Sequence, residues 1–123
     1  RIARQGFRRR QWPRAPHAFA EKALDAFQLL RRMTDAQGEA LRVVKLPMPA
    51  PVYFDGFRLP ASYANFYIAN GIVLVPVFND PADREALNTL ARLMPDRRII
   101  PIYCRDLVLG LGTLHCMPQQ QPE

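Results

Sequence analysis

The sequence has few cysteines, few glycines and no long apolar run. The 123-residue chain contains two cysteines, Cys104 and Cys116, and six glycines. No run of about 18 apolar residues occurs, so we expect no membrane-spanning helix and no membrane partner. Two cysteines and a histidine without paired spacing do not form a zinc pattern, so we expect no bound metal. The sequence leaves open whether the two cysteines form one disulfide.

Acidic residues are absent from the first 16 positions, which hold six arginines. The remainder of the chain has 11 basic and 11 acidic residues, so the net charge of +6 belongs to this segment. We expect residues 1–17 to form an unstructured basic leader. A basic arm could bind nucleic acid, but no helix-turn-helix, zinc spacing or aromatic alternation supports such a partner. No continuous apolar stretch follows the arginines, and cysteine is sparse. We therefore expect no secretory signal and a cytoplasmic location.

Apolar spacing predicts two helices. From Phe19 to Met33 the apolar residues recur at helical intervals, and Gly38 is a plausible stop. A second helix is predicted from Asp80-Pro81, since Asp80 can cap free amides and Pro81 suits the first helical position. Its predicted buried stripe ends before Pro95 and comprises Ala82, Ala86, Leu87, Leu90 and Leu93.

Five strands are predicted around these helices. A buried strand is expected at 41–46, before a proline-rich loop. Residues 65–68 and 72–77 read as a hairpin, because Asn70-Gly71 is the usual pair in a type I′ turn. Pro76 suggests that the second strand ends there or lies at an edge. Further strands are expected at 98–103 and 114–117, with Cys104 in the core.

The most informative segment is the last one, Gly110-Leu111-Gly112-Thr113-Leu114-His115-Cys116. Glycines let the backbone approach a small ligand, and a thiol beside them can attack a bound carbon. The segment resembles the nucleophile segment of the agmatine deiminases, in the bacterial peptidyl-arginine deiminase superfamily. Further segments resemble that family in the same order, and the resemblance covers about residue 18 to the C-terminus. These segments are Leu46-Pro47-Met48-Pro49-Ala50-Pro51, residues 61–71, Asn79-Asp80-Pro81-Ala82-Asp83 and Pro95-Asp96-Arg97.

The resemblance implies a fold, an activity and a site. The fold is an α/β propeller built from ββαβ modules, the pentein fold, of which residues 65–103 would be one complete module. The activity is hydrolysis of the guanidinium of agmatine to N-carbamoylputrescine and ammonia, without a cofactor. Cys116 matches the nucleophile position, and Gly110, Gly112 and Thr113 would bind substrate. Free arginine or peptidyl-arginine stays open as the substrate.

The sequence also departs from the family pattern. Leu111 stands where the family has Gly, Thr113 where it has Asn, and Pro118 where it has Thr. The family's upstream carboxylates and its Asp-Gly-His element are missing, so we expect the isolated chain, residues 18–123 of such a propeller, to be inactive. On a strand, His115 would point away from the Cys116 pocket. The alternative is a non-catalytic remnant or self-associating module of the same fold, which would form a homo-oligomer.

Overall fold

The computed structural model describes residues 16–119, with side chains from residue 22 onward. Contacts divide the chain after Val44 into two units. The basic leader predicted at 1–17 lies outside the described residues, except that Pro16 and His17 begin the first helix. None of the helices in the described part is long and apolar enough to cross a bilayer.

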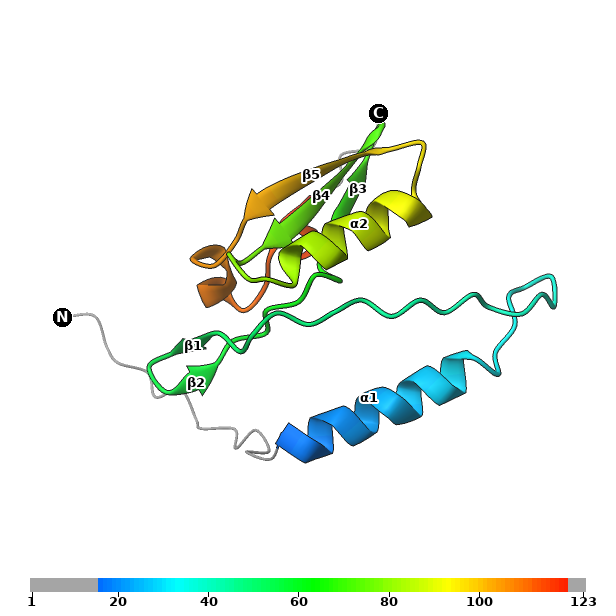
Figure 1. The fold of residues 1–123 in the computed structure, drawn as a ribbon, viewed down its shortest axis with the longest axis horizontal. Helices are drawn as coiled ribbons and strands as arrows, with labels where there is room; N and C mark the ends of the chain where they lie inside the picture. The colour runs from blue at the N-terminus through cyan, green and yellow to red at the C-terminus, as the bar shows by residue number, and fades with distance from the viewer. Residues whose placement is uncertain (1–15, 120–123) are drawn as a thin grey trace. The chain divides into compact units, whose positions relative to one another are not determined.

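The first unit contains helix α1 (Pro16–Leu30), as its apolar spacing predicts (Figure 1). The helix ends at Leu30, well before Gly38, so the prediction that this glycine stops the helix is wrong. Gly38 instead has φ +85° in a tight turn, in which the Asp35 carboxylate accepts hydrogen bonds from the amides of Gln37 and Glu39, both at 2.9 Å. Glycine suits this turn because it adopts positive φ without a Cβ clash.

The strand predicted at residues 41–46 is absent. This segment has no regular secondary structure, and most of it is exposed. A strand needs a hydrogen-bonded neighbour, and none of the strands in the described part pairs with this segment. Leu46, at the start of the second unit, still packs against that unit's core.

A short hairpin that the sequence analysis did not predict opens the second unit. Strand β1 (Tyr53–Phe54) pairs antiparallel with β2 (Phe57–Arg58). Asp55 and Gly56 connect the strands with φ of 47° and 74°, so both central residues have the positive φ of a type I′ turn. Asp-Gly between aromatic residues was therefore a readable hairpin signal.

The main sheet has the strand order β3-β4-β5. Strands β3 (Tyr67–Ala69) and β4 (Ile72–Val77) are antiparallel, and β4 and β5 (Arg98–Tyr103) are parallel. Helix α2 (Asp83–Leu93) connects β4 to β5 and lies along one face of the sheet (Figure 1). The predicted ββαβ order is confirmed, in a small α/β unit with a mixed sheet.

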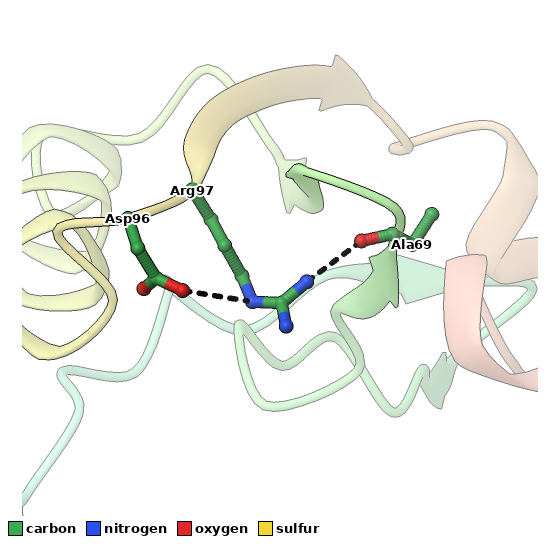
Figure 2. A network of polar contacts seen from close by, with 3 residues as sticks. All are labelled: Ala69, Asp96 and Arg97. Carbon is green, nitrogen blue, oxygen red and sulfur yellow. Dashed lines mark hydrogen bonds and ion pairs between the residues drawn. The ribbon is translucent and has the colours of Figure 1, made fainter.

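The β3–β4 turn is held by the loop before β5. Only Gly71 of its two central residues has positive φ, at 70°, so the predicted type I′ turn is wrong and the φ pattern is that of type II. Figure 2 shows the Arg97 guanidinium donating a hydrogen bond to the Ala69 carbonyl at 2.8 Å. The same guanidinium lies 4.0 Å from the Asp96 carboxylate.

Pro76 lies inside the central strand and is fully buried, so β4 neither ends there nor forms the edge of the sheet. The physical reason is local. Strand β3 pairs only with Ile72–Leu74, so at Pro76 one side of β4 has no strand partner. A missing amide is tolerated there because no ladder bond is required on that side.

Two groups of buried side chains form the core of the second unit. One lies between α2 and the sheet, where Val73, Val75 and Leu90 are almost fully buried. The other surrounds the start of α2 and comprises Val52, Leu59, Ala61, Tyr63, Phe78, Ala86, Cys104 and Val108. Cys104 is therefore a core residue, as predicted. Leu93 is 37% exposed, so its place in the predicted buried stripe is wrong.

The chain after β5 forms two 3₁₀-helices, η1 (Leu107–Gly110) and η2 (Leu114–Cys116). The prediction of a strand at 114–117 is therefore wrong. Backbone hydrogen bonds run from the Cys116 amide to Thr113 O at 3.1 Å and from the Met117 amide to Leu114 O at 3.4 Å. These local bonds replace the sheet neighbour that a strand would need.

Candidate functional site

Cys116 lies at the end of η2 with an exposed side chain. Its sulfur accepts a hydrogen bond from Nδ2 of Asn65 at 3.0 Å. Asn65 comes just before β3 and is 51 residues away in sequence. The strand predicted at 65–68 would begin at Asn65, but β3 begins at Tyr67. One sequence carries no signal that brings the Asn65 and Cys116 side chains together.

Gly112 makes room for Cys116. A Cβ at this position would lie 2.7 Å from the Cys116 Cβ and 2.9 Å from its sulfur, closer than real side chains approach. Glycine is needed here for space, since its φ is not in the left-handed region. The space beside Gly112 is filled by the Cys116 side chain. A role of Gly112 in substrate binding stays a prediction.

The other predicted turn residues have different environments. Gly110 ends η1, and a Cβ added there would meet nothing within 4 Å. Leu111 is in the left-handed region, with φ 66° and ψ 17°, and is 62% exposed. Thr113 is 1% exposed and its hydroxyl donates a 3.5 Å hydrogen bond to the Asn65 carbonyl. Burial makes Thr113 a structural tie between the two segments.

His115 lies beside the cysteine, which differs from the prediction made for a strand. In a 3₁₀-helix, consecutive side chains are about a third of a turn apart rather than on opposite faces. Its amide donates to Oδ1 of Asn65 at 2.8 Å. His115 and Asn65 also line an open pocket of about 320 Å³, together with Ser62 and Ala64.

Tyr63 anchors the segment that carries Asn65. Its ring is fully buried, and its hydroxyl donates to Oδ1 of Asp83 at 2.6 Å. Burial first, and then the hydrogen bond and negative charge of Asp83, raise the pKa of Tyr63 far above its usual value. The Asp83 carboxylate also accepts bonds from the amides of Phe78 and Asp80. This carboxylate therefore joins the pocket segment to the start of α2.

Asp80 ties a further loop to the same helix. Its carboxylate accepts hydrogen bonds from the amides of Ala82 at 2.9 Å and Ala50 at 2.8 Å. These two bonds lower the pKa of Asp80. The helix begins at Asp83, two positions later than the predicted start at Pro81. The N-cap is Ala82, and no side chain caps the helix, so the prediction that Asp80 caps its free amides is wrong.

The other cysteine has a different environment. Cys104 is fully buried, and this burial raises the pKa of its thiol. Both cysteines are free thiols, so the disulfide left open by the sequence is not formed. Of the two, Cys116 is the one that solvent and small molecules can reach.

The arrangement supplies an accessible thiol, an amide donor at its sulfur, and an open pocket that is lined by the donor Asn65 and by the neighbouring His115. These are features of a nucleophile that acts on a bound carbon. Within residues 22–119, no carboxylate is hydrogen-bonded or ion-paired to Cys116 or His115. No cluster of metal-ligating side chains occurs in that range either.

Comparisons with known proteins agree with one another. The family model of the Porphyromonas-type peptidyl-arginine deiminases matches residues 10–122. The agmatine deiminase of Pseudomonas putida is 39% identical over 115 residues, which cover 79% of this chain and 31% of that protein.

Two solved structures are also similar. The agmatine deiminase of Enterococcus faecalis, solved catalysing its reaction, superposes with a TM-score of 0.77 at 35% identity over 84% of this chain and 33% of that one. A cysteine-to-serine variant of the C. jejuni agmatine deiminase with substrate bound gives a TM-score of 0.58 at 34% identity, over 64% of this chain and 23% of that one.

The chain thus spans about a third of the length of the curated relatives that it matches. The family model covers nearly all of the chain, and several relatives share more than a third of their aligned residues with it. The chain belongs to the Porphyromonas-type peptidyl-arginine deiminase family, and its relatives include agmatine deiminases.

Proposed function

We propose that the protein containing this chain hydrolyses the guanidinium group of agmatine to N-carbamoylputrescine and ammonia, with Cys116 as the nucleophile. The observation that carries the proposal is the accessible Cys116 sulfur, held 3.0 Å from the amide of Asn65, a residue that lines an open pocket. The identity with agmatine deiminases supports the choice of substrate class.

The chemistry explains why a thiol is suited to this reaction. Guanidinium carbon is a weak electrophile because its charge is delocalised, so it requires a strong nucleophile. The Cys116 sulfur attacks this carbon, and ammonia leaves from the tetrahedral adduct, giving a thiouronium. Water then attacks the same carbon, a ureido group forms, and the thiol is released. One water is consumed and one ammonium is formed for each guanidinium.

We further propose that the chain is the C-terminal third of such an enzyme, and that β3-β4-α2-β5 is one ββαβ module of its propeller. The match to about a third of each relative's length supports this arrangement. Carboxylates that clamp the cation and a base for the water would then come from the other modules, since none contacts Cys116 within residues 22–119. Gly110, Gly112 and Thr113 would shape the floor of the site.

A chimera tests the function directly. Residues 10–122 replace the corresponding third of the Pseudomonas putida agmatine deiminase, and ammonia release from agmatine is measured. We expect hydrolysis that falls at least about a thousandfold in Cys116→Ala, because a covalent nucleophile has no substitute. Met117→Ala, at an exposed neighbouring position, is the matched control and should keep the activity. Hydrolysis that survives Cys116→Ala would contradict the proposal.

A second candidate function is self-association without catalysis. It is favoured by the β1–β2 hairpin, whose Tyr53, Phe54 and Phe57 are 55–63% exposed. Exposed aromatic side chains on an unpaired hairpin favour association. A folded but inactive chimera, together with a concentration-dependent dimer of the 123-residue chain in sedimentation, would support this candidate. A monomer at every concentration would count against it.

A further inference from the structure

Asn65 uses both ends of its side-chain amide on the segment that carries the cysteine. Nδ2 donates to the Cys116 sulfur at 3.0 Å, and Oδ1 accepts from the His115 amide at 2.8 Å. The orientation follows from chemistry, because a backbone N–H can only donate and must therefore face the oxygen. The nitrogen then has to face the sulfur.

The backbone of Asn65 adds to this connection. Its carbonyl accepts from the His115 amide at 3.2 Å and from the buried Thr113 hydroxyl at 3.5 Å. Asn65 thus contacts three of the four residues from Thr113 to Cys116. The Tyr63–Asp83 hydrogen bond, two residues earlier, fixes the segment from the other side.

We propose that Asn65 is a positioning residue for the nucleophile, which holds the Cys116 sulfur through its side-chain amide, next to Asn65 and His115, two of the residues that line the open pocket. The catalytic consequence rests on the function proposed above, whereas the effect on the thiol does not. An amide donor binds a charged acceptor more strongly than a neutral one. The contact is therefore strongest when the sulfur carries the negative charge that makes it nucleophilic.

Asn65→Asp separates positioning of the sulfur from support of the backbone. A carboxylate keeps an oxygen for the His115 amide but replaces the donor at the sulfur with an acceptor. The 123-residue chain is treated with iodoacetamide at neutral pH, and alkylation of each cysteine is followed by peptide mass spectrometry. We expect alkylation of Cys116 to slow about tenfold or more, the value of one hydrogen bond to a charged group.

Asn88→Asp is the matched control, because it makes the same change of charge on the exposed face of α2. Its Cys116 rate should stay within about twofold of the parent. Labelling of the buried Cys104 reports unfolding of either variant. If Asn65→Asp exposes Cys104, the alkylation rates of Cys116 and Cys104 are measured in Asn65→Ser instead. Its shorter side chain also lacks the amide.

An unchanged or faster Cys116 rate in a variant that keeps Cys104 protected would overturn the positioning role. In the chimera, Asn65→Asp should lower kcat with little change in KM, since the residue acts through the nucleophile. A slower alkylation rate in the chain with no hydrolysis by the parent chimera would retain the positioning role and reject the proposed function. The two proposals therefore fail separately.

Discussion

The space next to the Gly112 Cα is filled by the Cys116 side chain, so a side chain at position 112 would not fit there. The side chain of the cysteine takes the place of the Cβ that Gly112 lacks. The other glycine of the motif is Gly110, where an added Cβ would meet nothing within 4 Å. Gly112 therefore leaves space for the Cys116 side chain, whereas Gly110 does not, although the sequence alone gives both glycines the same interpretation.

Gly112→Ala should displace the cysteine. The added methyl would approach the Cys116 side chain to less than 3.0 Å, so that side chain or its backbone has to move. We expect a loss of about 1–3 kcal/mol in the free energy of unfolding, which is usual for overpacking, and a change in the Cys116 alkylation rate. Thermal unfolding and peptide mass spectrometry measure the two effects.

Gly110→Ala is the control for this change, because its new methyl would meet nothing within 4 Å. It should leave the alkylation rate as it is. Equal effects of the two substitutions would show that glycine acts in this turn through backbone freedom and not through the space it leaves for Cys116.

Leu111 has a backbone cost. The residue adopts φ 66°, where a side chain costs about 1–2 kcal/mol. With 62% of its surface exposed, the leucine gains little from packing. The turn keeps its left-handed shape with a leucine in it, so the departure from the motif does not remove the turn.

At the level of elements, the Tyr63–Asp83 hydrogen bond joins the pocket segment to helix α2. Tyr63 has a raised pKa, so its protonated form is favoured in the folded chain. The stability from this bond is fully present below the ordinary tyrosine pKa of 10.0. It is lost as the pH rises above that value, since the unfolded chain then ionises while the folded chain resists it.

Tyr63→Phe should therefore destabilise the chain most at neutral pH. We expect a loss of about 1–2 kcal/mol there, the value of one buried hydrogen bond. The difference from the parent should shrink above about pH 10. Urea unfolding at several pH values measures it. A difference that stays constant or grows with pH would show that this tyrosine does not control the alkaline stability.

Elements that depend on local sequence were the ones that could be predicted. The spacing before Gly38, the Asn70-Gly71 pair and the run at 98–103 each gave the right element type, and β5 has the predicted bounds. The β1–β2 hairpin carried an equally local signal at Asp55-Gly56.

Apolar composition alone was not sufficient where a segment has no strand beside it. The run at 41–46 has strand composition but no strand beside it, and Leu114–Met117 is apolar but held by i, i+3 hydrogen bonds. The contact between Asn65 and Cys116 spans 51 residues. The family resemblance predicted a role for Cys116, which stays a prediction, and the structure was needed to find the hydrogen-bond donor at its sulfur.

At the scale of the whole molecule, the chain corresponds to about a third of the length of its relatives. An exposed thiol and its amide donor are present, whereas no carboxylate contacts them within residues 22–119. We therefore expect the full reaction to need further segments of the protein, with Cys116 as the residue that bonds covalently to the substrate.

A mass measurement tests that role most directly. The chimera is quenched in acid during turnover of agmatine and digested. The mass of the peptide that contains Cys116 is then measured by mass spectrometry. We expect a substrate-derived thiouronium on Cys116, absent without agmatine and absent in Cys116→Ala. Sustained turnover with this peptide always unmodified, or an adduct on another residue, would contradict it.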